Sequence, residues 1–599
     1  MNRMLRASML AGAAALLSSI VPASHPNPSA ESSSLAPDAL AMLDPIARAS
    51  SLCGTRGGSM LRRRLSIASL FAAPADAAVQ APMPLFAGVE GLRFPVSTTN
   101  EQARRYFQQG MMLSYGFNHA AAIASFRAAQ RLDPACALCW WGEAVAHGPN
   151  INAPMDLAAI KPTLAALAKA QSLRSGATPA EQALIDAAAV RYSADLKADR
   201  AALDSAYAGA MLRVAQSHPA HDDIALLAAE AVMDTSPWDY WEADGRTAKG
   251  RIGDAVRLVE QVLARNPGHP QASHLYIHLL EKVAPERAES AADRLAKDGP
   301  PAAGHLVHMP AHIYYRRGRF SDSIRANVAA ARADEAYIKA SGDQGLYRYG
   351  YYPHNVHFIV TSAQMAGDMG VAIAEARRLG GLVSTDIAAQ YGWIQAISAA
   401  PYLAFAQFAA PERTLALPAP DPRLLYVAGM RHYARAIAHA QRRSRALFDQ
   451  ELAALRAIRG SPKLDEMTKQ GMPAPDLLLL AETAARGRYA FASKQYDEAV
   501  RYYREAAAIE DRIPYMEPPY WYYPVRQSLG AALYRSGRYG EAKAAFQEAL
   551  TRYPANGWAL YGLAASERAL GNRPEAAAAD QALQRAWLGD RKWLRIDRL

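Results

Sequence analysis

Small and apolar residues recur at helical spacing along most of this 599-residue chain, in short units that often end at a proline. The pattern is clearest in GDAVRLVEQVLARNP (253–267), KQYDEAVRYYREAAAIED (494–511) and GNRPEAAAADQAL (571–583). Apolar positions three and four residues apart lie on one face of a helix, so each unit predicts an amphipathic helix. A terminal proline ends the helix because it has no amide hydrogen. We expect an all-α protein, and no segment predicts a strand.

Two distant stretches share one spacing of small and aromatic residues. Alanine, aromatic, alanine and proline follow a glycine by 12, 16, 19 and 24 residues in both, as Gly110, Ala122, Phe126, Ala129, Pro134 and as Gly530, Ala542, Phe546, Ala549, Pro554. The small residues let two helices touch, and the aromatic ring fills the space between them. This spacing resembles the tetratricopeptide repeat, a helix–turn–helix unit of about 34 residues. The resemblance implies a right-handed α-α superhelix.

Composition shifts divide the chain into segments. The Pro-rich run ALPAPDPR (416–423) predicts a break between two lobes. The expected segments are an export leader at 1–77, a linker at 78–97, an N-terminal lobe at 98–415 and a C-terminal lobe at 424–599.

Two export-like segments lie within the leader. Met1–Val21 has a basic start and a short apolar run, and a second segment begins at Met60 with three arginines and ends in an A-x-A cleavage signal, Ala75–Ala77. Either translation starts at Met60 or the intervening stretch is a low-complexity leader; an uncleaved anchor at Met1 is the alternative. We predict a periplasmic or secreted mature protein with no stable membrane span.

Composition excludes several other classes. Apolar residues make up 51% and charged residues 20% of the chain, which indicates a folded, soluble protein and not a disordered one. The formal net charge is +10, but lysine and arginine are dispersed, so we predict no nucleic-acid partner. No nucleophile triad, phosphate loop or dinucleotide fingerprint is present.

Histidines are concentrated in one region. Eight of the 15 lie between residues 269 and 357. His274 and His278 are four residues apart, as are His308 and His312, so each pair shares a helix face and can chelate one ion. Imidazoles protonated together in a groove would repel one another, whereas a shared metal ion uses their lone pairs. A polar peptide-binding groove with histidine donors is the alternative.

The repeat resemblance implies which of these residues face the groove. Its register places seven histidines and one glutamate there: His274, His278, Glu281, His305, His308, His312, His354 and His357. We predict that the histidines bind copper, zinc or iron, because imidazole suits such metals. Their number exceeds one tetrahedral site, so the centre is dinuclear or some histidines only support the ligands.

Carboxylates near these histidines extend the prediction. Glu281 is a ligand, a bridge or a general base, and we assign it as the leading proton-transfer group. Asp334 and Glu335 are further oxygen donors. Because proline is tolerated only in a first turn, Pro310 predicts a helix that begins near His308 and leaves His305 in the preceding turn.

Cys136 and Cys139 form the one cysteine pair downstream of the leader. At the start of a helix they fit a structural disulfide, half of a metal site or a redox-active pair. Trp140 stands where covalent haem attachment requires histidine, which disfavours a c-type haem. Two aromatic-rich segments, 233–245 and 515–530, are either lids over the groove or packing between repeats.

Taken together, CALCWWGEAVAHGPNINAP, HLYIHLLE, GHLVHMPAHIYYRRGRF, YYPHNVHF and EPPYWYYPVR resemble a group of exported bacterial tetratricopeptide proteins, over about residues 98–590. The resemblance implies the fold, export and a histidine-rich centre, with no established reaction. Two functions follow: a metalloprotein that binds or transforms a small molecule or peptide in its groove, or a non-catalytic scaffold for a protein partner.

Overall fold

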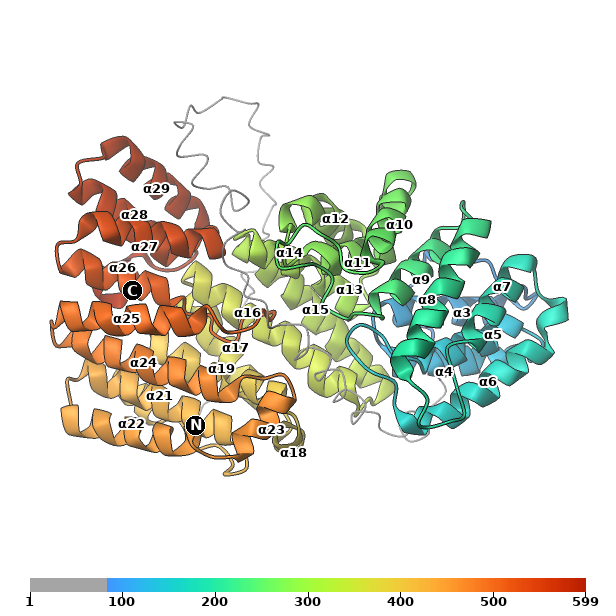
Figure 1. Cartoon of the computed structure of the whole chain (residues 1–599), viewed down its shortest axis with the longest axis horizontal. Helices are drawn as coiled ribbons and strands as arrows, with labels where there is room; N and C mark the ends of the chain where they lie inside the picture. Colours follow the sequence, from blue (N-terminus) through green and yellow to red (C-terminus); the bar gives the residue numbers. More distant parts are fainter. Residues whose placement is uncertain (1–82) are drawn as a thin grey trace, which may run out of the picture.

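The computed structural model describes residues 83–599, and its helices form one curved stack (Figure 1). The export segments predicted within residues 1–77, and the start of the 78–97 linker, lie outside the described residues. Between residues 83 and 599 there is no strand, and two isolated bridges join Asn150 to Ala153 and Trp241 to Ala248. The prediction of an all-α superhelix is confirmed.

The first third of the described chain contains α3 (Glu101–Tyr115), α4 (His119–Leu132), α5 (Ala137–Ala146), α6 (Ile160–Ser172), α7 (Pro179–Ala189), α8 (Arg200–Ser217), α9 (Asp222–Met233) and α10 (Ile252–Arg265). The centre contains α11 (Pro270–Leu280), α12 (Pro285–Asp298), α13 (Gly304–His308), α14 (Pro310–Arg316), α15 (Phe320–Ser341), α16 (Tyr352–Ala366), α17 (Met369–Leu382), α18 (Thr385–Gln390), α19 (Gly392–Phe408) and α20 (Pro411–Leu415). The last third contains α21 (Leu425–Gln441), α22 (Arg445–Arg459), α23 (Lys463–Lys469), α24 (Ala474–Ala492), α25 (Tyr496–Glu510), α26 (Val525–Arg535), α27 (Tyr539–Arg552), α28 (Gly557–Ala569) and α29 (Arg573–Ala586). Short 3-10 and π turns include η5 (Tyr347–Tyr351) and η7 (Ile596–Arg598).

The repeats pack through glycines that border a buried aromatic ring. A Cβ atom added to Gly110 in α3 or to Gly142 in α5 would lie 2.6 or 2.5 Å from the ring of Phe126 in α4. Near the other end of the chain, Gly530 and Gly562 border Phe546 in the same way, at 2.7 and 2.2 Å. Glycine therefore lets consecutive helices approach the ring on both sides, as the shared spacing predicts.

The apolar core forms two large clusters that meet at α15. The first extends from Met83 to Tyr347 and the second from Ala331 to Leu599. The Pro-rich segment 416–423 does not separate two cores, because Leu417 and Leu424 both pack in the second cluster. These prolines connect α20 to α21 within one packed body, and the change of core lies earlier than the predicted break.

The C-terminal repeats curve back onto the centre of the chain. Trp558 of α28 donates its Nε1–H to the carbonyl of Gln364 in α16 at 3.0 Å, and the Leu588 amide donates to Ala366 at the same distance. Gly367, with φ 75°, ends α16 where an added Cβ would meet Trp587 at 2.1 Å. This closure places the connection between α25 and α26, residues 511–524, beside the histidine helices.

Among residues 83–599, no helix combines the length and the apolar character that a membrane crossing requires.

Replacing Gly142 with alanine tests the repeat packing. The new Cβ would lie 2.5 Å from the fully buried ring of Phe126, so we expect the free energy of unfolding to fall by about 1–3 kcal/mol. Urea denaturation measures the change. Gly176→Ala is the control, because no atom lies within 4 Å of its added Cβ. Equal destabilisation in both variants would contradict this packing argument.

Candidate metal centre

Six of the seven predicted histidines converge in two neighbouring groups. The first histidine group comprises His274, His278 and His305, and the second comprises His308, His312 and His354. Within each group one nitrogen per ring lies within 4.8 Å of the others. The groups adjoin, since the ring centroids of His278 and His312 are 5.8 Å apart, as are those of His305 and His308.

A break at Pro310 sets the positions of three of these rings. α13 ends at His308, and Pro310 is the first residue of α14, but Met309 between them keeps helical angles (φ −50°, ψ −39°). The two short helices therefore follow one course, and His308 and His312 stay on the same side, one turn apart. The expectation that His305 precedes the helix is wrong, because α13 begins at Gly304 and includes it.

Side-chain oxygens hold the Nδ1 atoms of the rings. Gln271 Oε1 lies 2.9 Å from His274 Nδ1, and Asn327 Oδ1 lies 2.6 Å from His308 Nδ1. An amide oxygen accepts, so each Nδ1 must carry the hydrogen. This fixes the tautomer and leaves the lone pair on Nε2, as in histidines that bind metal through Nε2.

Glu281 accepts a hydrogen bond from the Nδ1 atom of one ring in each group. Its Oε1 accepts from His278 Nδ1 at 3.0 Å and its Oε2 from His312 Nδ1 at 2.6 Å. Burial alone would raise the pKa of Glu281, but His312 and His278 together lower that pKa to about 2. Glu281 is therefore an ionised carboxylate with both oxygens in use.

Several other ring nitrogens of the two histidine groups lack a hydrogen-bond donor or acceptor. Among the described residues, Nε2 of His274 and His278 and both nitrogens of His305 are buried without a hydrogen bond. His308 Nε2 and His312 Nε2 face one another at 2.8 Å. With hydrogens on both Nδ1 atoms, two lone pairs meet there, and only a shared cation, a proton or a metal ion, relieves the repulsion.

Burial favours the neutral, ligating form of most rings. Desolvation, reinforced by neighbouring imidazoles, lowers the pKa of His274, His305, His308 and His354 well below its ordinary value. Neutral imidazole is the form that binds metal ions. His312 is the exception, because Glu281 raises its pKa despite burial, so the second group contains one ring that favours a proton.

Aromatic side chains in unusual backbone conformations border the first group. Phe117 (φ 53°) and Trp238 (φ 62°) are left-handed although neither is glycine. The Phe117 ring centroid lies 4.8 Å from that of His274, and the Trp238 centroid lies 5.0 Å from that of His278. The ring centroids of Tyr351 and His305 are 5.1 Å apart. Such conformations cost about 1–3 kcal/mol and occur preferentially at functional sites.

Those aromatic residues were not identified as site residues from the sequence. Trp238 lies in the 233–245 segment that was predicted to be a lid or packing, and its Nε1–H donates to Asn152 Oδ1 at 3.0 Å. No sequence signal marks Phe117, because its role depends on a backbone angle.

Asp334 and Glu335 do not join the histidines. Asp334 is fully buried and accepts from Tyr347 at 2.8 Å and from Asn355 at 2.7 Å, and the Tyr347 hydroxyl in turn accepts from the His305 amide at 3.1 Å. Asp334 therefore supports the start of α13. Glu335 instead pairs with Arg378 at 2.6 Å and belongs to neither group.

Glu517, in the 511–524 connection, is a site residue that the sequence prediction missed. It is buried, and neither carboxylate oxygen meets the distance and angle of a hydrogen bond among the described residues, although the Tyr515 hydroxyl helps to lower its pKa. Burial raises the pKa of Glu517 to about 7, although Arg316 and His312 lower it. A buried carboxyl within electrostatic reach of His312 is a candidate oxygen donor for the second group.

His357 lies outside both groups. Its ring centroid is 5.5 Å from that of Tyr522 in the same connection. Residues three apart are neighbours on a helix surface, yet of these two only His354 belongs to the second group.

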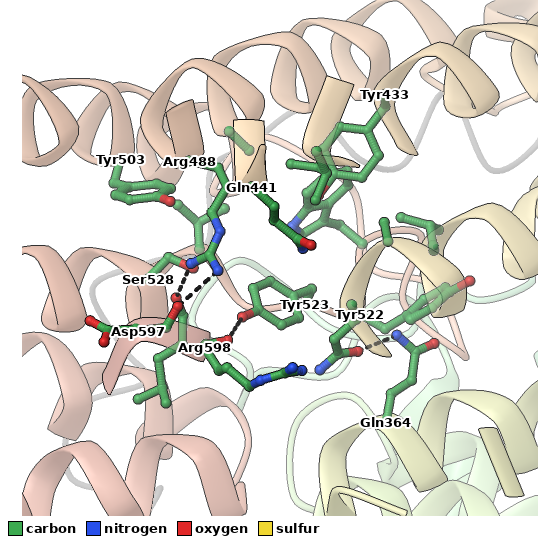
Figure 2. Close-up of a pocket in the computed structure, with 18 of the residues that line it drawn as sticks. Gln364, Tyr433, Gln441, Arg488, Tyr503, Tyr522, Tyr523, Ser528, Asp597 and Arg598 are labelled. Carbon is green, nitrogen blue, oxygen red and sulfur yellow. Dashed lines mark hydrogen bonds between the residues drawn. The ribbon is translucent and has the colours of Figure 1, made fainter. Parts of the chain in front are cut away.

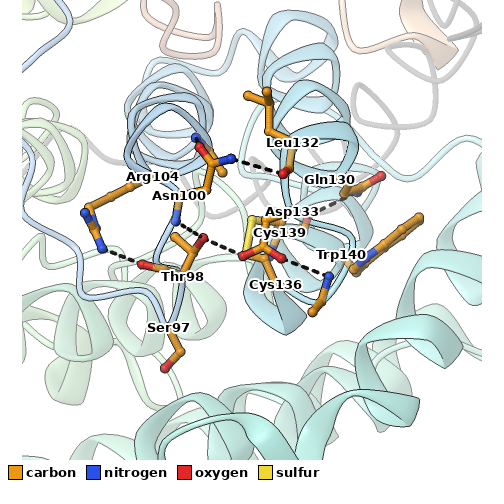
Figure 3. The surroundings of a disulfide bond; sticks show 12 residues. Ser97, Thr98, Asn100, Arg104, Gln130, Leu132, Asp133, Cys136, Cys139 and Trp140 are labelled. Atoms are coloured by element: carbon orange, nitrogen blue, oxygen red, sulfur yellow. Dashed lines mark hydrogen bonds between the residues drawn. A yellow bond between two sulfur atoms is a disulfide. The ribbon is translucent and has the colours of Figure 1, made fainter.

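Cys136 and Cys139 form a disulfide at the start of α5, with Cα atoms 5.4 Å apart (Figure 3). Of the three alternatives, the structure contains the disulfide. Next to it, Thr98 donates to Asp133 Oδ2 at 2.5 Å, which ties the chain before α3 to the α4–α5 turn. Both cysteines are fully buried.

Comparisons with known proteins agree with this architecture. Two family models described as tetratricopeptide repeat match residues 103–136 and 525–556. The chain carries tetratricopeptide repeats in both halves. The comparison with curated proteins finds no match.

Several solved structures are loosely similar. One is the human IFIT1 dimer with m7Gppp-AAAA, which is 11% identical over 89% of this chain and 96% of that chain, with a TM-score of 0.28. Another is yeast Tom70, which is 10% identical over 83% of this chain and 95% of that chain, with a TM-score of 0.29. The Cut9–Hcn1 hetero-tetramer of APC/C is a third, 13% identical over 81% of this chain and 90% of that chain, with a TM-score of 0.25.

Replacing Glu281 with glutamine tests whether this carboxylate holds both rings. Glutamine offers one oxygen acceptor, so one Nδ1–H would lose its partner and face an amide donor. We expect the free energy of unfolding, measured in buffer with a chelator, to fall by about 1–3 kcal/mol. Glu286→Gln is the matched control, since no hydrogen bond or ion pair is formed by Glu286 in the described structure. An unchanged stability for Glu281→Gln would show that the two contacts are unimportant.

Proposed function

We propose that this protein is an exported tetratricopeptide-repeat metalloprotein whose two histidine groups each bind one transition-metal ion and present it to a small molecule. One observation carries the proposal: four of the six rings are held through Nδ1, and their Nε2 atoms converge without hydrogen-bond donors. Buried nitrogen atoms without partners cost about 1–3 kcal/mol each, and a metal ion removes that cost.

The donor set favours copper, zinc or iron. Each group offers three imidazoles, and the support of four Nδ1 atoms by carboxylate and amide oxygens is typical of transition-metal sites. Three protein ligands leave a coordination position for an exogenous molecule. Calcium and magnesium would need more oxygen donors than these groups contain.

Glu281 fits a positioning role better than proton transfer. Its two oxygens already accept from His278 and His312, and its pKa of about 2 makes it a weak base. Because Glu281 orients one ring of each group, it would set the direction of one ligand of a metal ion bound to either group.

A small molecule fits the site better than a peptide chain. Five of the six histidines are between 0% and 3% exposed, so an extended peptide could not contact them without local opening. Phe117, Trp238 and Tyr351 supply flat apolar surfaces beside the first group. These surfaces suit a small organic ligand next to an open coordination position.

Protein binding is the second candidate function. Tetratricopeptide repeats commonly serve as interaction scaffolds, and the matched repeats at 103–136 and 525–556 lie at opposite ends of the superhelix. In that case the outer repeats would hold a protein partner independently of the buried histidines.

Elemental analysis of the full chain, purified without a His tag, tests metal binding. We expect about two equivalents of a transition metal, one for each group. His274→Ala/His278→Ala and His308→Ala/His312→Ala should each lose about one equivalent, because each removes two of three ligands.

His218→Ala is the control for that experiment, since His218 caps the C-terminal end of α8 and joins neither group. A metal-free wild type that takes up no copper, zinc or iron would refute the metalloprotein proposal and leave the scaffold function.

Export has its own test. The Ala75–Ala77 signal predicts cleavage after Ala77, so N-terminal sequencing of protein recovered from a periplasmic fraction should begin at Ala78. Ala75→Phe should block cleavage, because the signal requires small residues. The disulfide supports an oxidising compartment. Recovery of uncleaved protein only in the cytoplasm would contradict export.

A further inference from the structure

A cavity of about 230 Å³ lies on the inner side of the C-terminal repeats, apart from the histidine groups (Figure 2). Helices α16, α19, α21, α24, α25 and α26 contribute to its wall, and the last residues of the sequence close it. Since one water occupies about 30 Å³ in the liquid, the space holds roughly seven or eight waters. It is the size of a small organic molecule and too small for a peptide.

Positive charge dominates this cavity. Its lining includes three arginines, Arg488, Arg595 and Arg598, against two acidic groups, the Asp597 side chain and the carboxylate of the last residue, Leu599. The Asp597 carboxylate pairs with Arg535, outside the lining, at 2.7 Å. The charge of Asp597 is therefore already balanced elsewhere.

Arg488 and Arg598 differ in how their guanidinium groups are satisfied. Arg488 donates to the main-chain oxygens of Asp597 at 2.8 Å and Leu599 at 3.4 Å (Figure 2). Arg598 makes no ion pair or side-chain hydrogen bond in the described structure, and its guanidinium stacks 3.7 Å from the Trp593 ring centroid. Burial, with Arg595 and Arg488 nearby, lowers the pKa of Arg598. A partly buried guanidinium beside two others is unfavourable without an anion.

The rest of the wall is aromatic. Five rings line the cavity: Tyr433, Tyr503, Trp521, Tyr522 and Tyr523. The Trp521 Nε1–H is buried without an acceptor among the described residues, although the side chain is only 3% exposed. A buried indole donor normally finds an acceptor, and an acidic ligand would supply one.

We infer that this cavity binds a small aromatic carboxylate, with its ring among the tyrosines and its carboxylate directed to Arg598 and Arg595. The planar guanidinium matches a carboxylate in a bidentate fashion, and aromatic walls favour a flat body. Guanidinium groups bind phosphate as well, so the aromatic wall is what favours a carboxylate on a flat ring, and inorganic phosphate is the competing anion that the experiment compares. The inference is independent of the proposed metal sites.

Titration calorimetry with benzoate tests the inference, using the full chain with any tag at its N-terminal end and a chelator in the buffer. We expect saturable binding at one site, at least tenfold weaker binding of the neutral analogue benzamide, and weaker benzoate binding at high salt. His308→Ala/His312→Ala should bind benzoate as the wild type does, which excludes coordination to a metal ion.

Variants of the arginines complete the test. Arg598→Gln should weaken benzoate binding at least tenfold, and Arg595→Gln, at an exposed position where folding is not at risk, about threefold. Arg501→Gln is the matched control, because Arg501 is an exposed arginine 4.1 Å from the Tyr502 ring centroid and lies outside the cavity. Benzamide binding as tight as benzoate, phosphate binding as tight as benzoate, unchanged binding in Arg598→Gln or no saturable benzoate binding would each overturn the inference.

Discussion

The centre of this protein depends on one buried carboxylate that two imidazoles share. Glu281, directly after α11, accepts from His278 on its own helix and from His312 on α14. A buried carboxylate is costly unless charge or hydrogen-bond donors compensate it, and here both oxygens have a donor. In the same contacts it fixes the tautomer of both rings. The ionised acid, the two tautomers and the separation of the two histidine groups are therefore one linked arrangement.

The superhelix explains why these residues can meet at all. Successive helices of a solenoid present corresponding faces at nearly constant spacing, so α11, the α13–α14 pair and α16 bring their histidines to one place. The closure of α28 and α29 onto α16 then covers this place with the 511–524 connection. From this segment, about 200 residues away in sequence, Tyr522 contacts His357 and the charge of Glu517 acts on His312.

Local signals made most of the fold predictable. The glycine and aromatic spacing determines how neighbouring helices touch, and residues four apart share a face in any helix, so the repeats and the pairs His274–His278 and His308–His312 followed from the sequence. Features that depend on backbone angles or distant packing did not. His305 lies inside a one-turn helix, Phe117 and Trp238 adopt left-handed angles, and His357 turns toward Tyr522.

Burial bears on the alternative of a peptide-binding groove lined by histidine donors. A groove that binds peptides through histidine needs rings with exposed polar atoms, whereas five of these six rings are at most 3% exposed. Each unpaired buried nitrogen destabilises the folded state by about 1–3 kcal/mol. A ligand that binds these nitrogens only in the folded state therefore stabilises that state. Metal binding at these groups would therefore contribute directly to folding, in addition to any role toward a small molecule.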